Sequence, residues 1–175
     1  MVAASRPTHP DRSGQRNQPI DTSSNSRRAV TRPKFDAVDI VTESAPYTVP
    51  CIDCGSPTQS TLTEALVGED HRWDIDGQCS ACGAIWADCG YQQPHPDFRE
   101  AILAANRTTV LELGSVDVPA ATLMRALRLT RSLSLTAAKA LAADLRTTGL
   151  KGTRVEMELI ARQLHAMGVH TRKSK

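Results

Sequence analysis

The clearest hydrophobic periodicity of the chain lies in its C-terminal part, residues 108–175. The segment TTVLEL at 108–113 consists of β-branched and apolar residues with one glutamate, and a glycine ends the run, so it predicts a strand. We expect Asp117 to cap a first helix, with Pro119 in its first turn, where a missing N–H costs nothing. The buried side of this helix is predicted from apolar residues at helical spacing: Leu123, Ala126 and Leu127.

The rest of this periodicity predicts two more helices and two short strands. The second helix is expected from about Leu135 to Thr147, where Gly149 stops it. The LKG that follows is a candidate strand, and TRVE at 153–156 is a capping box whose helix continues to Gly168. VHTR at 169–172 is expected to close the domain as a last strand. The order β-α-α-β-α-β predicts a small antiparallel sheet with helices packed on one face, which is an α+β fold.

Three further parts are predicted before this domain. Residues 1–34 are rich in Ser, Pro, Asn, Gln and Arg and almost free of large apolar side chains, so this arm is expected to be disordered. Residues 35–93 have few helix signals and many turn formers, which indicates a small module. Its expected core consists of four residues: Trp73, Ile75, Ile85 and Trp86. Residues 94–107 predict a linker helix with Asp97 near its N-cap.

Charge is segregated along the chain, although the net charge is only +2. Residues 1–34 carry a net +5, residues 35–106 a net −10 and residues 107–175 a net +7. Blocks of opposite sign indicate parts with different surfaces, and a basic surface fits an acidic partner. All six aromatic residues lie at or before Phe98, so the C-terminal domain cannot bind single strands by stacking bases on aromatic rings.

Two CxxC pairs in the turn-rich module carry the strongest chemical signal. CIDCG begins at Cys51 and CSACG at Cys79, with twenty-four residues between Cys54 and Cys79. Each pair places two thiolates on one small loop, and the glycine after its second cysteine permits positive φ. Two such loops close a tetrahedral site, so the sequence predicts a zinc ribbon with one structural Zn²⁺. Its predicted ligands are the four paired thiols: Cys51, Cys54, Cys79 and Cys82.

Redox chemistry is the main competing interpretation of these cysteines. A redox CxxC motif needs only one pair in a βαβ context, and neither condition fits here. Four protein thiolates would also fill the coordination sphere and leave no position for water, so a catalytic zinc is not expected. The fifth cysteine, Cys89 in DCGY, either replaces one of the ligands or is a buried apolar thiol, and the second interpretation is favoured.

The same observations exclude several classes of function. Paired cysteines in CxxC spacing argue against a disulfide framework, and no apolar run is long enough to cross a bilayer, so we expect a cytoplasmic protein without a membrane partner. The sequence has no Ser-His-Asp order, no Gly-rich phosphate loop and no open metal site. We therefore expect a protein that is not an enzyme and has no small-molecule substrate.

The C-terminal part resembles a known family. VLEL, then PAATLMRALRLTRSLSLTAAKALAADL, then GLKGTRVEMELIARQLHAMGVHTR, is similar to the C-terminal domain of the bacterial large-subunit ribosomal stalk protein. The resemblance covers roughly the last 65 residues and is most specific at 133–139 and at the Gly-hydrophobic pair 168–169. That domain recruits translational GTPases, so the resemblance implies a translational GTPase or the ribosome as partner.

In the stalk family the GTPases dock on the first two helices through basic and aliphatic side chains. Carried over by position, the resemblance implies four partner-binding residues: Met124, Arg125, Arg128 and Lys139. Ala120 and Ala121 depart from the family's lysine and valine. The helical dimerisation domain and hinge that anchor the stalk protein are replaced here by an arm and a cysteine module, so a stalk subunit at the usual ribosomal place is not expected.

These observations leave more than one functional hypothesis. The first is an adaptor associated with the ribosome or a translation factor, whose C-terminal domain binds a GTPase and whose zinc ribbon and arm contact RNA or another protein. Four basic residues of the arm could contact phosphate, although a plain solubilising tail is the favoured interpretation: Arg27, Arg28, Arg32 and Lys34. The alternative is a zinc-ribbon regulator that binds nucleic acid directly and uses the C-terminal domain for protein contacts. The acidic charge of the ribbon counts against the alternative. A substrate adaptor of an ATP-dependent protease is a third, weaker hypothesis, which rests only on a related fold.

Overall fold

The described part of the chain consists of a four-stranded sheet, a three-stranded sheet and four helices. The computed structural model describes residues 39–91, 95–115 and 117–175, all within one unit formed by residues 35–175. The predicted disordered arm, residues 1–34, lies outside the described residues. Among the described residues, no helix has the length and apolar character needed to cross a membrane.

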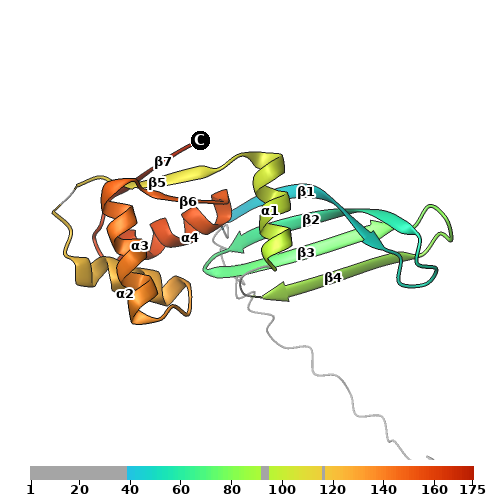
Figure 1. Ribbon diagram of the computed structural model, residues 1–175, viewed down its shortest axis with the longest axis horizontal. Helices are drawn as coiled ribbons and strands as arrows, with labels where there is room; N and C mark the ends of the chain where they lie inside the picture. The colour runs from blue at the N-terminus through green and yellow to red at the C-terminus, as the bar shows by residue number, and fades with distance from the viewer. Residues whose placement is uncertain (1–38, 92–94, 116) are drawn as a thin grey trace, which may run out of the picture. The chain divides into compact units, whose positions relative to one another are not determined.

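A four-stranded antiparallel sheet occupies the first half of the described chain (Figure 1). Its strands follow one another in space as they do in sequence: β1 (Ile40–Pro50), β2 (Pro57–Val67), β3 (Asp70–Gln78) and β4 (Ile85–Tyr91). Burial alternates along β1, where Val41, Glu43 and Ala45 are buried and the residues between them are exposed. One face, here named the covered face, therefore carries most of the buried residues of this sheet, because side chains alternate between the two faces of a strand.

Helix α1 (Pro96–Asn106) packs on the covered face through its apolar side. Ile102 is buried, and the Phe98 ring makes edge-to-face contacts with Tyr47 and Trp73, at 5.1 Å between ring centroids in each case. The linker helix is thus present, but its N-cap is His95, whose ring nitrogen accepts the backbone N–H of Asp97.

The expected core of this module was right for Ile75 and wrong for Ile85. Ile75 is buried on the covered face, with Trp73 and Trp86 packed partly buried against the same cluster. Ile85 is 79% exposed. Its register partner is Gln78, which places it on the opposite face of the sheet, where no helix of the described residues covers it.

A second, three-stranded antiparallel sheet lies in the C-terminal part, in the order β6-β5-β7. Its strands are β5 (Thr109–Leu113), β6 (Leu150–Gly152) and β7 (Thr171–Ser174), and its helices are α2 (Ala120–Thr130), α3 (Leu135–Thr147) and α4 (Arg154–Ala166). Leu111 of the central strand is fully buried against the helices in an aliphatic core that includes the three predicted residues of α2. The described residues thus have a mixed α+β fold, as predicted, with two antiparallel sheets and four helices.

The ends of these helices follow local sequence signals, with one exception. The capping box at α4 is present: the Thr153 side chain accepts the Glu156 N–H, and the Glu156 side chain accepts the Thr153 N–H. The cap expected from Asp117 is wrong, since α2 begins after Pro119 and no side chain of the described residues caps it. The φ of Pro119 would suit a first helical residue, but its ψ of 136° is extended. Pro119 is therefore the N-cap, and the helix begins at Ala120.

Helix α4 joins the two sheets. Val155 and Leu159 form a buried cluster with Val41 of β1 and Leu66 of β2. Arg162 donates to the carbonyl of Gly68 at 2.7 Å, between β2 and β3, and this contact ties the middle of α4 to the same sheet.

The buried carboxylate of Glu156, at the start of α4, forms ion pairs with two arginines from other parts of the chain. Glu156, 4% exposed, accepts two hydrogen bonds from the Arg99 guanidinium of α1, at 2.8 and 3.0 Å. Arg131, just after α2, lies 3.3 Å from the same carboxylate and is 20% exposed. The i+3 spacing of Arg125, Arg128 and Arg131 predicts one exposed row of arginines on the first helix of the C-terminal part. That prediction is wrong for Arg131, because α2 ends there and its side chain lies against Glu156.

Candidate metal centre and docking surface

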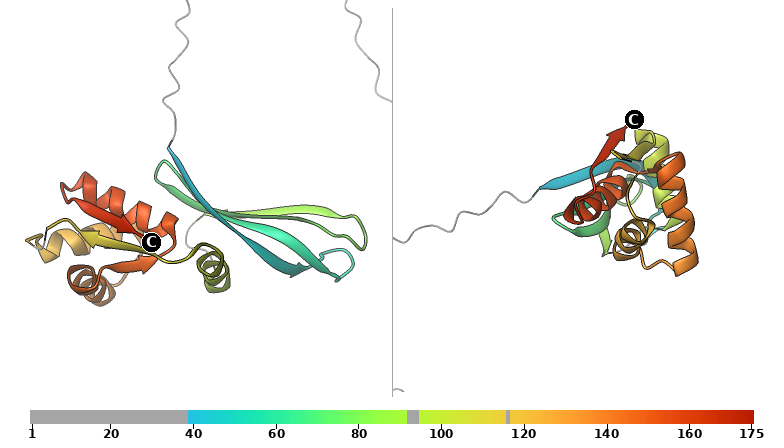
Figure 2. Two further views of the ribbon diagram at one scale, coloured as in Figure 1. Left: turned by 90° about the horizontal axis from the view of Figure 1, so that it is seen from above. Right: turned by 90° about the vertical axis from the view of Figure 1, so that its left-hand side faces the viewer.

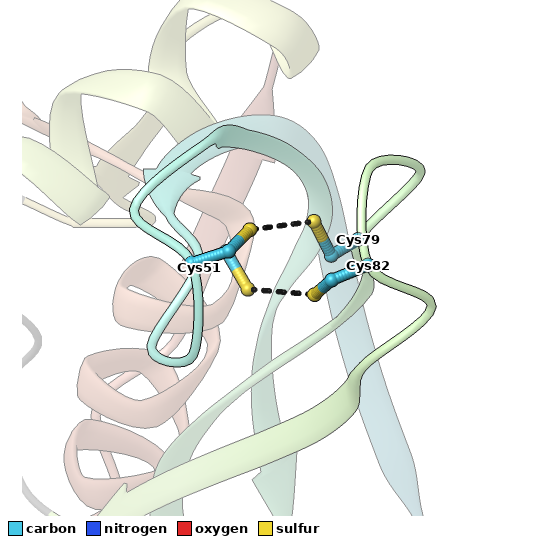
Figure 3. A group of neighbouring side chains, drawn as sticks. Cys51, Cys79 and Cys82 are labelled. Carbon is cyan, nitrogen blue, oxygen red and sulfur yellow. Dashed lines mark hydrogen bonds between the residues drawn. The ribbon is translucent and has the colours of Figure 1, made fainter.

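The two CxxC loops meet because the four-stranded sheet is a meander. The first loop connects β1 to β2 and the second connects β3 to β4, so both lie at the same end of the sheet, here named the metal end. Figure 3 shows Cys51 of the first loop facing Cys79 and Cys82 of the second. Residues 31 positions apart in sequence are thereby brought within contact distance.

The two loops repeat one backbone conformation. In the first, Cys51 donates its N–H to Ser56 and accepts the N–H of Gly55. In the second, Cys79 donates to Ala84 and accepts from the following glycine in the same way. Both glycines have positive φ, 73° at Gly55 and 79° at Gly83, which is the conformation that the sequence predicted for them. The backbone hydrogen bonds of each loop therefore help to fix the position of its two sulfurs.

The four sulfurs have the spacing of a tetrahedral thiolate site. The Sγ atoms of Cys51 and Cys82 are 3.6 Å apart, and those of Cys54 and Cys79 are 3.7 Å apart. All four lie within 4.8 Å of one another. A tetrahedron with metal–sulfur bonds of about 2.3 Å has sulfur–sulfur edges of roughly 3.8 Å. The predicted ligands are therefore together, and close enough to hold a metal ion.

The pKa shifts of these thiols differ in direction from one cysteine to another. Backbone N–H groups of Cys82 and Ala81 lower the pKa of Cys79 to about 6, and the Ser56 hydroxyl and N–H lower the pKa of Cys54. For Cys82 the Ala84 N–H acts in the lowering direction, but the neighbouring sulfurs of Cys54 and Cys51 outweigh it and raise the pKa to about 12. A thiolate next to another sulfur makes deprotonation of that second thiol less favourable. A bound cation would favour the thiolate form of all four.

Cys89 takes no part in this cluster. It lies on β4, is exposed, and is not among the residues whose sulfurs converge. Its backbone N–H donates to the Asp88 carboxylate at 2.8 Å. The expectation of a buried apolar thiol is thus wrong, because Cys89 pairs with Asp74 on the exposed face of the sheet.

The four residues that the stalk resemblance assigns to a partner lie on one surface of α2 and α3, here named the basic helical face. Arg125, Arg128 and Lys139 are exposed, and Met124 is partly buried beside the core. Met124, Arg125 and Arg128 line a groove of about 640 Å³ along α2. Met124 and Lys139 line a second groove of about 280 Å³ between α2 and α3. The methionine thus lies between the two grooves.

Sequence reasoning missed the most exposed apolar residues of this surface. Leu129 is 63% exposed and Leu135 is 62% exposed, and both line the larger groove. Leu129 falls outside the apolar stripe of α2, and Leu135 directly follows the N-cap Ser134. A leucine off the core stripe of a predicted helix was the available signal, because such a side chain has no place in the core.

Comparisons of this chain with protein-family models, with curated proteins and with solved structures give no match. The stalk-domain resemblance therefore rests on the residues alone. The geometry of the cysteine cluster and of the basic helical face carries the functional conclusions that follow.

Proposed function

We propose that the protein is a non-enzymatic adaptor of the translation apparatus. A structural Zn²⁺ on the four cysteines stabilises the metal end of the sheet, and the basic helical face binds a translational GTPase. The observation that carries this proposal is the arrangement on α2 and α3, where exposed cations line two neighbouring grooves that share the apolar Met124.

The donor set supports zinc as the metal. Four thiolates suit a soft or borderline ion, and the sulfur–sulfur distances of 3.6 and 3.7 Å are close to the edge of a tetrahedral Zn²⁺ site. Zn²⁺ bound by four protein ligands has no open position, so its role here is to hold the two loops together. Such binding supplies about 10–16 kcal/mol in small zinc modules.

The basic helical face suits a partner with an acidic, partly apolar surface. The exposed Leu129 and Leu135 offer apolar area that is removed from water on binding, while Arg125 and Arg128 steer the approach and fix the register. Neither arginine appears among the ion pairs of the described residues, so both are available to a partner. An acidic GTPase helix is such a surface.

The double substitution Arg125→Glu with Arg128→Glu tests this proposal. We expect it to weaken binding of purified elongation GTPases at least about tenfold, because two cations become like charges toward the partner. Biolayer interferometry with the immobilised full chain measures the loss.

A matched control makes the same change of net charge elsewhere. Lys151→Glu with Arg172→Glu reverses two exposed cations on β6 and β7 and is expected to leave binding unchanged. Equal binding by wild type and by the Arg125 and Arg128 variant would exclude the basic helical face as the GTPase site.

A further inference from the structure

An apolar cavity distinct from the two grooves of the basic helical face lies at the metal end of the four-stranded sheet, on its covered face. Its volume is about 590 Å³, and its walls are formed by Val49 of β1, Ile52 of the first cysteine loop, Ile75 of β3, Trp86 and Asp88 of β4, and Phe98 of α1. Only Asp88 among these six side chains is charged. The function proposed above does not use this cavity.

The cavity exists because α1 covers only part of the sheet. Figure 2 shows the strands continuing well beyond α1 toward the ends that carry the cysteine loops. Phe98 lies in the first turn of α1 and closes one side of the core cluster, and Val49 and Trp86 remain only partly buried beyond it. The apolar core of the sheet therefore opens to solvent at the metal end.

Two features of the walls indicate a binding site for an apolar side chain. Ile52 lies at the rim of the cavity and is 85% exposed, so the cysteine loop presents a large apolar side chain to solvent. The indole Nε1 of Trp86 is buried and has no hydrogen-bond partner among the described residues. Because solvent does not reach this nitrogen, a bound peptide would meet the apolar ring of Trp86 and not its N–H.

The charge around the cavity selects the class of partner. Between Lys34 and Arg99 the only basic residue is Arg72, and its strand register with Tyr91 places it at the far end of β4 from the metal end. The cavity itself includes Asp88, and Asp53 and Asp97 follow Ile52 and precede Phe98 in sequence. This surface repels phosphate backbones and acidic segments and attracts cations.

We infer that this cavity binds a basic peptide segment of another protein, with one large apolar side chain inserted between Ile75, Trp86 and Phe98. Lysine or arginine residues beside that anchor pair with Asp88 and the neighbouring carboxylates. The site lies on the four-stranded sheet and the basic helical face lies on α2 and α3, so the inference goes beyond the proposed function and does not depend on it.

Fluorescence anisotropy with labelled peptides tests this inference on the purified full chain. The probe is Lys-Lys-Leu-Lys-Lys, and two comparison peptides replace its leucine by alanine or its lysines by glutamates. We expect the probe to bind, the alanine peptide to bind at least about tenfold more weakly, and the glutamate peptide not to bind. Equal binding of the alanine and leucine peptides would show unspecific charge attraction and overturn the inference.

Variants of the walls locate the site. Asp88→Asn keeps the oxygen that accepts the Cys89 N–H, and Ile52→Ser changes an exposed side chain, so both are expected to fold. Each should weaken the probe at least about fivefold. Asp70→Asn makes the same charge change at the turn between β2 and β3, at the opposite end of the sheet, and should have no effect.

Two further measurements decide between partners. The Arg125→Glu with Arg128→Glu variant should bind the probe as wild type does, so a failed GTPase test leaves this inference standing, and the reverse also holds. Light scattering of wild type and Ile52→Ser reports the oligomeric state. An oligomer that Ile52→Ser dissociates would assign the cavity to a second copy of the chain and overturn the inference.

Discussion

Glu156 is a residue at which three elements of the protein meet. Burial alone raises the pKa of its carboxyl group, but the hydrogen-bonded Arg99 and the charge of Arg131 outweigh burial and leave that pKa below the ordinary value of 4.5. The same carboxylate completes the capping box of α4. It therefore fixes the start of α4 relative to α1 and to the end of α2.

Replacing this carboxylate should cost stability in a pH-dependent way. Glu156→Gln leaves Arg99 and Arg131 without a counter-charge, and we expect the free energy of unfolding at pH 7 to fall by about 2–3 kcal/mol, since the partly exposed Arg99 is partly solvated. A carboxyl group with a lowered pKa in the folded state stabilises the fold above its unfolded pKa. The difference between wild type and variant should thus shrink as the pH falls below about 4.5.

Urea denaturation between pH 7 and pH 3 measures this difference. Glu112→Gln is the matched control, because Glu112 is 50% exposed and lies 3.9 Å from Arg172 in a surface pair. That control should change the unfolding free energy by less than about 1 kcal/mol at any pH. A difference for Glu156→Gln that stays constant down to pH 3 would contradict the role assigned to its charge.

Single residues were predictable from the sequence where the signal was local. The four cysteine ligands follow from two short motifs, and the glycines after them have the positive φ that each loop requires. Ile85 and Cys89 were placed wrongly because their exposure depends on the register of β4 against β3. Register is a property of two strands together, and no local motif announces it.

At the scale of elements, the junction between α3 and β6 depends on one glycine. Gly149 has a φ of +78°, and a Cβ there would lie 2.8 Å from the Leu111 carbonyl oxygen of β5. Gly168, after α4, has nearly the same φ of +77°, but nothing lies within 4 Å of its Cβ position. The two glycines thus separate backbone strain from steric crowding.

We expect Gly149→Ala to destabilise the protein more than Gly168→Ala. Both pay roughly 1–2 kcal/mol for an alanine with positive φ. Gly149→Ala adds about 1–3 kcal/mol, because β5 or the turn must shift to relieve the contact. Thermal unfolding of the two variants in parallel gives the comparison, and equal losses would show that the close approach to β5 has no energetic weight.

Helices were predicted better than strands. The bounds expected for α3 coincide with those observed because Ser134 and Gly149 mark its two ends locally. The four-stranded sheet was read only as a turn-rich module. Its strands carry Glu43, Ser60 and Glu64 at buried positions, so polar residues on the covered face hide the alternation that identifies a strand.

At the scale of the whole molecule, the aromatic residues and the helices report on different halves. Trp73 and Trp86 both lie on the four-stranded sheet, whereas α2, α3 and α4 belong to the C-terminal part, which contains no aromatic residue. Tryptophan fluorescence therefore follows the sheet, and far-ultraviolet circular dichroism near 222 nm mainly follows the helices.

Removing the metal should change the tryptophan fluorescence and leave most of the helical circular dichroism signal unchanged. Wild type is expected to hold about one zinc ion per chain, and Cys51→Ser with Cys79→Ser to hold none. The variant should show a changed tryptophan emission and a largely retained helical signal, because the aliphatic core of the C-terminal part contains no residue of the four-stranded sheet. Mass spectrometry under native conditions and the two spectra measure these outcomes.

Cys89→Ser provides the control for this experiment, since that thiol is exposed and outside the cluster. It should retain zinc and both spectra. Wild-type protein without metal would end the structural zinc proposal. Collapse of the helical signal in the cysteine variant would show that the C-terminal part cannot fold without the sheet.

The length of β1 has one more consequence. Its eleven residues span roughly 35 Å, with the cysteine loops after one end and the contacts to α4 near the other. Two partners bound at these two ends would be held at a fixed distance by hydrogen-bonded strands, and not by a flexible linker. Adding or removing residue pairs in β1 and β2 together would then change the distance between the two bound partners.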